Sequence, residues 1–248
     1  CTNEERVITN ELITQLLTSD QPCFIGRIGT VEGAVVLNYN QIKSNRNYFL
    51  KLYDYITDET RLPFWDLGRP IKELKSNAGF FPINNIRLIE DFAELYLNNI
   101  PKIDLCGRFE YYEKFLPFSN KCHMVQLETL YPFFVKNPWS KCLENKKVLV
   151  IHPFKESIEK QYLKRKDLFD NPNILPDFNL KVLKAVQTLA GEKSEYSSWF
   201  EALEYMKTEI NNIDFDIAII GCGAYGLPLA SHVKDIGKKA IHLGGGTQ

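Results

Sequence analysis

Three glycines near the end of the chain, Gly221, Gly223 and Gly226, directly follow a strand-like run from Phe215 to Ile220. Glycine at the end of a strand lets the backbone turn tightly and come close to a ligand. Pro228 follows at a position that suits the first turn of a helix. Because the unpaired N–H groups at a helix start attract anions, this segment predicts a site for a phosphate or diphosphate group.

The spacing of these glycines also matches the dinucleotide-binding fingerprint, which expects an acidic residue about 20 residues further on. Here the second strand, KKAIHLGGG, carries His242 and glycines at that position. An enzyme that binds NAD or FAD therefore stays open only as an alternative, as does a purely structural role in helix packing. The second glycine turn, Gly244 to Gly246, favours ligand binding because it has no evident packing purpose.

Several other residues that could bind a ligand follow predicted strands. Arg27 ends the strand-like run PCFIGRI and could contact an anion or simply be a surface charge. Glu32 falls in the first turn of a predicted helix, where a carboxylate also offsets the helix dipole. His152 ends the buried run KVLVI. One predicted helix face carries Ser157, Gln161 and Arg165, which suit phosphate or sugar hydroxyls but equally a solvated surface.

Strands that alternate with helices would position these residues. Predicted strands cover 22–28, 103–106, 122–127, 147–151, 180–188 and 215–220, and predicted helices cover 2–17, 30–38 with Thr30 as N-cap, 47–56, 84–97, 157–165 and 198–210. This pattern predicts an α/β fold with a Rossmann-like, mostly parallel sheet and helices on both faces. Such sheets bind ligands beyond the carboxyl ends of their strands. One rim should therefore hold the segments 27–32, 152–157, 221–226 and 242–246.

Composition limits the functional class. The 248 residues, 44% of them hydrophobic, can bury the core of a single domain, with a possible sub-boundary at 137–146. Lys and Arg total 30 against 31 acids, so nucleic acid is not expected as a partner. Six cysteines without CxxC spacing favour reduced thiols and a cytoplasmic location. No apolar run approaches the ~20 residues of a transmembrane segment. Residues 61–82, rich in Pro, Gly and aromatics, suggest a functional loop.

Two segments, FIGRIGTVEG and IGCGAYGLPLASHVKDIGKKAIHLGG, resemble those of the GT-D fold glycosyltransferases and their bacterial relatives. In that family an R-x-G-D-x-E turn and a C-terminal glycine-rich βαβ unit flank the nucleotide-sugar site. VLVIHPFKESIEKQY is similar to the central strand and helix of the group. Arg27, Gly29 and Glu32 match the family turn, whereas Thr30 stands where the metal-binding Asp is expected.

The resemblance implies a glycosyltransferase that takes a nucleotide diphosphate sugar, a UDP-sugar above all, and transfers the sugar to a bacterial cell-surface glycan or glycoprotein. A non-catalytic nucleotide-sugar-binding protein stays open as an alternative. With Thr30 in place of Asp, Glu32 is the only charged ligand from the turn, so Mn²⁺ or Mg²⁺ would bind weakly or not at all. Arg27 and Glu32 would be catalytic, and the substrate-binding residues would be Gly29, Thr30, His152, Ser157, Gln161, Arg165, Gly221, Gly223, Ala224, Tyr225, Gly226, His242, Gly244 and Gly245.

Overall fold

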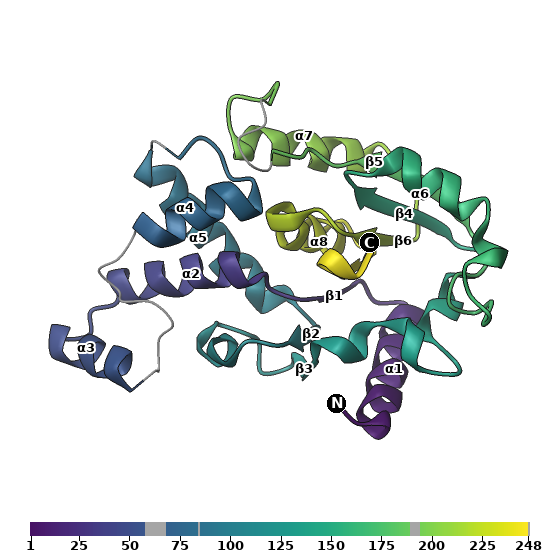
Figure 1. The fold of residues 1–248 in the computed structure, drawn as a ribbon, viewed down its shortest axis with the longest axis horizontal. Coiled ribbons are helices and arrows are strands. Elements are labelled where there is room, and N and C mark those ends of the chain that lie inside the picture. Colours follow the sequence, from purple (N-terminus) through teal and green to yellow (C-terminus); the bar gives the residue numbers. More distant parts are fainter. Residues whose placement is uncertain (58–67, 84, 189–193, 248) are drawn as a thin grey trace.

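The computed structural model describes residues 1–57, 68–83, 85–188 and 194–247. Its centre is a seven-stranded sheet with the order β3-β2-β1-β7-β6-β4-β5 (Figure 1). Every pairing between neighbouring strands is parallel, which confirms the predicted α/β fold. The strands are β1 (Cys23–Gly26), β2 (Leu105–Arg108), β3 (His123–Gln126), β4 (Lys147–His152), β5 (Asn179–Lys184), β6 (Ile217–Ile220) and β7 (Lys239–His242).

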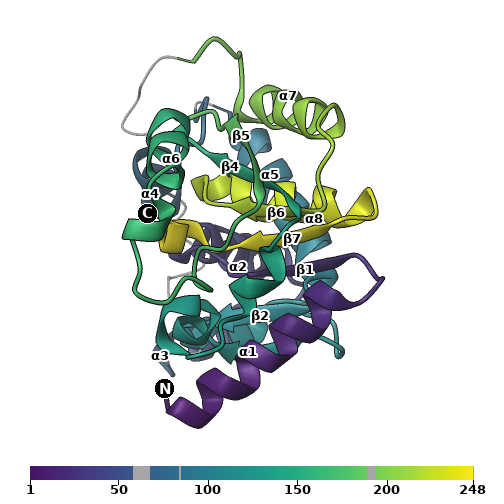
Figure 2. The same cartoon turned by 90° about the vertical axis from the view of Figure 1, so that its right-hand side faces the viewer.

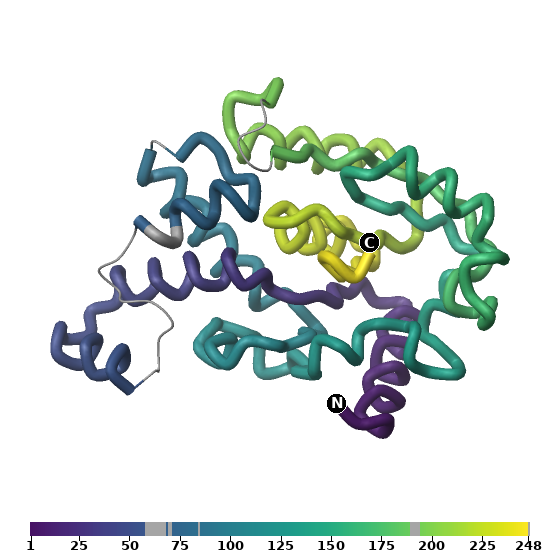
Figure 3. The backbone as a smooth tube through the Cα atoms, in the orientation of Figure 1, coloured from purple at the N-terminus to yellow at the C-terminus, as the bar shows by residue number. Residues whose placement is uncertain are grey.

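The order of the strands brings distant parts of the chain together. The labels in Figure 2 descend from β5 through β4, β6, β7 and β1 to β2, and the tube in Figure 3 shows the first and last strands near each other at the centre. β7 pairs with β1 on one side and with β6 on the other. The sheet therefore continues across the candidate sub-boundary at 137–146, which lies between β3 and β4 in sequence.

Helices cover both faces of this sheet. Five of them pack against one face, namely α2 (Thr30–Lys43), α4 (Gly68–Ala78), α5 (Ile86–Asn99), α7 (Trp199–Asn211) and α8 (Gly226–Asp235). On the other face lie α1 (Asn3–Thr18), α6 (Lys155–Tyr162) and several short 3-10 turns. The nine-residue helix α3 (Tyr48–Ile56) stands at the edge of the molecule in Figure 1.

Alternation along the strands builds two separate cores. In β4, Leu149 and Ile151 pack with the five-helix face, whereas Val148 and Val150 pack with the face that holds α1 and α6. This is the two-residue period of a strand that is covered on both sides. On the five-helix side, the ring of Trp199 stacks on that of Tyr225 with centroids 4.8 Å apart, which ties α7 to the segment that follows β6.

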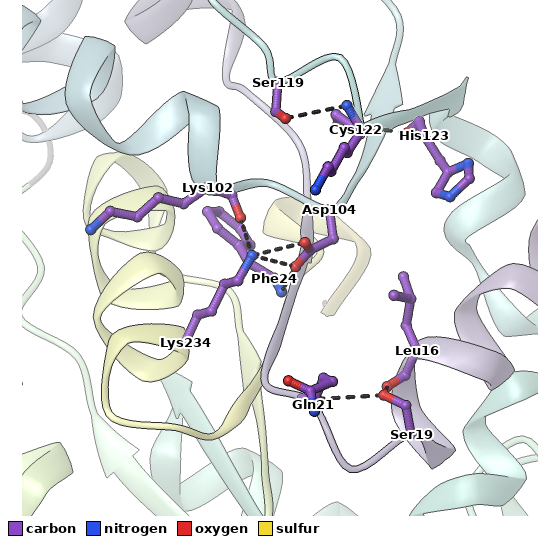
Figure 4. A network of polar contacts seen from close by, with 11 residues as sticks. Leu16, Ser19, Gln21, Phe24, Lys102, Asp104, Ser119, Cys122, His123 and Lys234 are labelled. Carbon is purple, nitrogen blue, oxygen red and sulfur yellow. Dashed lines mark hydrogen bonds and ion pairs between the residues drawn. The ribbon is translucent and has the colours of Figure 1, made fainter.

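A polar network holds the amino ends of β1 and β2 to α8 (Figure 4). The Nζ atom of Lys234 donates to both carboxylate oxygens of Asp104, at 2.8 and 2.7 Å, and to the carbonyl of Lys102 at 2.7 Å. The N–H of Phe24 donates to the same carboxylate at 2.8 Å. Because the Asp104 carboxylate has an ion pair and hydrogen bonds, these contacts offset the free-energy cost of its partial burial.

Most predicted elements are confirmed, although several boundaries differ. β1 ends at Gly26 and not at Ile28, and α2 continues to Lys43 and not only to Asn38. α4 lies within the region predicted as a loop, because Ile71, Leu74 and Ala78 form a helical stripe that the nearby Pro and Gly residues obscure. Residues 58–67 of that region lie outside the described residues. Gly29, not Thr30, is the N-cap of α2, and Thr30 is the first residue of the helix. β5 ends at Lys184 instead of 188, and α6 begins at Lys155 and ends at Tyr162.

Candidate functional site

A cleft of about 320 Å³ opens at the carboxyl ends of the strands. All four segments predicted for this rim contribute to its wall, through Arg27 and Gly29 to Glu32, Pro153, Gly221 to Gly223 with Tyr225, and His242 with Gly244 and Gly245. Asn77 to Gly79, at the end of α4 and within the region 61–82 that was predicted to be functional, add to the wall. Two stretches that the sequence analysis did not single out also add to it, namely Tyr96 of α5 and Val186 to Thr188 after β5. The structure thus brings together the two glycine turns and the segment after β1.

Among the described residues that line this cleft, Arg27 is the one with a cationic side chain. Its guanidinium carbon lies 4.5 Å from the centroid of the Phe109 ring, and a Cβ atom built on Gly244 would lie 3.4 Å from its Cδ. Among the described residues, Arg27 forms no ion pair with a carboxylate. The side chain is therefore held by an aromatic face and a close backbone while its charge is available to a ligand.

The start of α2 forms the wall next to Arg27. Gly29 has no side chain that could cap the helix, and the first intrahelical bond runs from Gly33 N–H to the Gly29 carbonyl at 2.8 Å. Thr30, Val31 and Glu32 line the cleft, and their N–H groups precede the regular bonding pattern of the helix. The N–H of Glu32 bonds to its own carboxyl group. A helix start of this kind, next to an arginine, suits an anionic ligand.

Glu32 is folded back onto its own turn and is buried. A Cβ atom on Gly29 would lie 2.0 Å from a carboxylate oxygen of Glu32, so a larger residue there would force the end of the Glu32 side chain to move. Burial raises the pKa of Glu32, while a hydrogen bond from its own backbone and the charge of Arg27 act in the opposite direction. Glu32 thus lines the cleft as a carboxyl group that keeps its proton more readily than an exposed one.

In the turn after β6, some residues pack against the protein interior and others line the cleft. Gly226 packs against the His242 ring, because a Cβ atom there would lie 2.0 Å from its Cε1. Ala224 is buried, and its carbonyl accepts a 2.7 Å hydrogen bond from the Tyr96 hydroxyl. Neither residue lines the cleft. Gly223 does, with φ of +58°, and a Cβ atom there would have the Ala78 carbonyl oxygen, 4.0 Å away, as its nearest neighbour. Close packing therefore explains Gly226, and not Gly223.

Two histidines next to the glycine turns are held neutral. His242 lines the cleft, its Nδ1 lies 3.2 Å from the Ile220 carbonyl, and burial lowers its pKa to about 4, with Arg27 acting in the same direction. His152 lies behind Gly221 and not in the cleft wall, contrary to its predicted role as a ligand contact.

Burial also lowers the pKa of His152. Its Nδ1 accepts from the Phe154 N–H at 3.1 Å, which assigns the proton to Nε2. That Nε2 atom is buried and has no hydrogen-bond partner among the described residues. The sequence-based role fails here because β4 ends with this side chain packed under the turn that follows β6.

The predicted helix face with Ser157, Gln161 and Arg165 does not reach the cleft. Ser157 and Gln161 are exposed, and Arg165 pairs with Asp177 at 2.7 Å beyond the end of α6. The physical reason is topological. The connection after β4 crosses on the face opposite to the helices that border the cleft, so α6 runs away from the rim after Pro153. The expected substrate contacts of these three residues are not supported by their positions.

Within the described residues, no group of three or more His, Cys, Asp or Glu side chains is placed to hold a metal ion. Instead of a ligand at position 30, the structure shows the Thr30 hydroxyl donating to a carboxylate oxygen of Glu110 at 3.0 Å.

Comparisons with known proteins give no further identification. No family model, curated protein or solved structure matches the chain. In the part of the chain that the structure describes, no helix combines the length and apolar character needed to cross a membrane.

Proposed function

We propose that the cleft binds a nucleotide diphosphate sugar, with a UDP-sugar as the first choice, and that the protein is a GT-D-like glycosyltransferase. The acceptor would be a bacterial cell-surface glycan or glycoprotein. The observation that carries this proposal is the meeting of Arg27 with the start of α2 and the Gly223 turn in one cleft. Each feature alone is common, but together they converge on a diphosphate.

The chemistry of transfer fits these positions. When the bond between sugar and diphosphate breaks, negative charge grows on the departing diphosphate, and donors already aimed at that charge lower the barrier. Arg27 and the N–H groups of Thr30 and Val31 would be such donors, since all three residues line the cleft. A volume of about 320 Å³ also lies within the range of pockets for small ligands.

Glu32 is the candidate for proton transfer in the cleft. A buried carboxyl group with a raised pKa is a poor ligand for a divalent cation, since such a cation wants several charged or polar oxygens. In its ionised form it can accept the proton of an acceptor hydroxyl as a general base. We therefore propose that Mn²⁺ or Mg²⁺ contributes little to binding, and that Arg27 supplies the positive charge.

Two alternatives make different predictions. A dinucleotide enzyme needs an acceptor for the ribose hydroxyls after the second strand, where this chain has the buried and neutral His242 packed on Gly226. A non-catalytic protein would bind the nucleotide sugar without releasing UDP. Calorimetry with UDP and NAD, followed by measurement of UDP release from UDP-sugars, separates these possibilities.

The decisive test compares Arg27→Ala with a matched control. The control is Arg6→Ala. In the wild type the guanidinium carbon of Arg6 lies 4.7 Å from the centroid of the Phe134 ring, which is a similar arrangement outside the cleft. Arg27→Ala should weaken UDP binding by roughly 1.5 to 3 kcal/mol, as for a hydrogen bond to a charged group, and leave uridine binding almost unchanged. Arg6→Ala should bind both ligands like the wild type.

The proposal fails if the wild type does not bind UDP, or if NAD binds more tightly than UDP. Equal losses of UDP and uridine affinity in Arg27→Ala would give Arg27 a structural role instead. The melting temperature of each variant identifies any loss that comes from unfolding.

A further inference from the structure

A second hollow, of about 530 Å³, lies beside the cleft at the carboxyl ends of β2 and β3. We call it the β2–β3 groove. Its wall includes residues of three kinds: the aromatic rings of Phe109 and Tyr111, the carboxylates of Glu110 and Glu128, and the amide of Gln126. Arg108 and Lys114 balance the two carboxylates in charge. The groove is therefore polar and aromatic, without a net charge from its lining.

Two contacts join this groove to the cleft. The Phe109 ring, which lines the groove, lies 4.5 Å from the Arg27 guanidinium carbon of the cleft. The Glu110 carboxylate, also in the groove wall, accepts the hydrogen bond from the cleft residue Thr30. A molecule in the groove would therefore lie one side chain away from a ligand in the cleft.

We propose that the β2–β3 groove is the acceptor subsite and that it takes a neutral sugar unit. This inference rests on the proposed function of the cleft. The C–H face of a sugar ring is apolar and slightly positive, and it suits the negative face of an aromatic ring. Phe109 and Tyr111 are 42% and 60% exposed, so both residues are accessible from the groove, with the Lys114 Nζ 3.8 Å from the centroid of the Tyr111 ring.

The polar groups of the groove match the hydroxyls of a sugar. Carboxylates accept hydrogen bonds, and the Gln126 amide both donates and accepts them, so a molecule with many hydroxyl groups can be satisfied from both sides. A phosphate-rich polymer is less suitable because the positive and negative charges of the groove lining cancel, so the groove offers no net attraction to phosphates. A nucleotide is expected to bind in the cleft instead, because Arg27 there has no ion pair among the described residues and can contact a phosphate.

The experiment measures saturation-transfer NMR signals from three neutral disaccharides, cellobiose, maltose and N,N′-diacetylchitobiose. It uses the wild type, Tyr111→Ala and the control Tyr53→Ala. Tyr53 on α3 is 62% exposed, as Tyr111 is 60% exposed, but it lies on no wall of either hollow. At least one disaccharide should give a signal with the wild type and with Tyr53→Ala. In Tyr111→Ala its affinity should fall roughly tenfold, the upper end for one aromatic contact.

Calorimetry with UDP on the same three proteins separates this inference from the proposed function. UDP should bind all three with the same affinity, since Tyr111 does not line the cleft. Sugar binding without UDP binding would overturn the function of the cleft and leave the groove as a sugar site. UDP binding without any disaccharide signal would overturn the groove as a neutral-sugar site and leave the cleft intact.

Two further outcomes also contradict the inference. Unchanged disaccharide affinity in Tyr111→Ala would place the sugar elsewhere. Signals from a serine- and threonine-rich peptide, with none from the disaccharides, would assign the groove to a polypeptide acceptor instead. Circular dichroism of Tyr111→Ala checks that the variant is folded, and an exposed side chain of this kind is expected to contribute little to stability.

Discussion

Glu113 provides a quantitative test of the region that joins the cleft to the β2–β3 groove. It lies in the 3-10 turn Tyr111–Phe115 and is only 3% exposed. Its Oε2 accepts from the N–H groups of Phe109 at 3.1 Å and Glu110 at 3.4 Å, while Oε1 is buried without a hydrogen-bond partner among the described residues. Burial is the main cause that raises the pKa of Glu113 from 4.5 to about 7.

This rise has a definite effect on stability. Between pH 4.5 and about 7 the folded protein keeps the Glu113 proton, whereas the unfolded chain has released it. The contribution of Glu113 to the free energy of unfolding therefore falls as the pH rises through this range. A pKa change from 4.5 to about 7 corresponds to about 3 kcal/mol.

Glu113→Gln removes the ionisation and keeps an oxygen that can accept from Phe109 and Glu110. The free energy of unfolding of the variant, minus that of the wild type, should increase by about 3 kcal/mol between pH 4.5 and 8. Urea denaturation of both proteins at a series of pH values gives this difference. Any cost of burying the amide is the same at every pH. The test is therefore how the difference in free energy of unfolding between variant and wild type changes with pH.

The comparison between the two proteins is necessary because His242 acts in the opposite direction. Its folded pKa is lowered from 6.5 to about 4, so its stabilising contribution is present above pH 6.5 and is lost as the pH falls toward 4. In the wild type the two slopes oppose each other between pH 4.5 and 6.5. A difference between variant and wild type that stays constant from pH 4.5 to 8 would refute the assignment of a raised pKa to Glu113.

Two further predictions concern the cleft. Gly223 and Gly237 have φ angles of +58° and +81°, so alanine at either position should lower the free energy of unfolding by about 1 to 2 kcal/mol. Only Gly223→Ala should also weaken UDP binding in calorimetry, and equal affinities in the two variants would contradict its place at the ligand. Thr30→Asp puts a second carboxylate beside Glu110, so Mn²⁺ should raise the melting temperature of this variant alone. A Mn²⁺ effect of the same size in the wild type or in Thr30→Asn would indicate a metal held elsewhere.

The sequence predicted the sheet well because local signals and packing agree in it. The run from Phe215 to His242 has strand, glycine turn, helix and strand in order, and the structure forms β6, α8 and β7 there. The carboxyl-end rule then placed four distant segments on one rim, and all four line the cleft. A single sequence is sufficient to place these segments, because ligand binding at the carboxyl ends of parallel strands depends only on the direction of the strands.

Side-chain roles were harder to predict because they depend on which face each connection takes. Ser157 and Gln161 have the right spacing but leave the rim with α6. Tyr96 and Thr188 join the cleft through packing of α5 and the segment after β5, for which the sequence carries no local signal. For the β2–β3 groove the sequence does carry a local signal, because the aromatic and acidic segment 109–113 follows the carboxyl end of a predicted strand.

The central position of β7 has a consequence for how the protein is made. Within the described strands, the group β3-β2-β1 and the group β6-β4-β5 are joined only through β7, which is synthesised after both. Until β7 emerges from the ribosome, the edges of β1 and β6 that pair with it in the finished sheet have no partner among the other described strands. Such edges are prone to pair with other chains. Arg27 meets His242 and Gly244 only when β7 inserts, so the completion of the sheet and the formation of its cleft are one event, which follows the synthesis of β7.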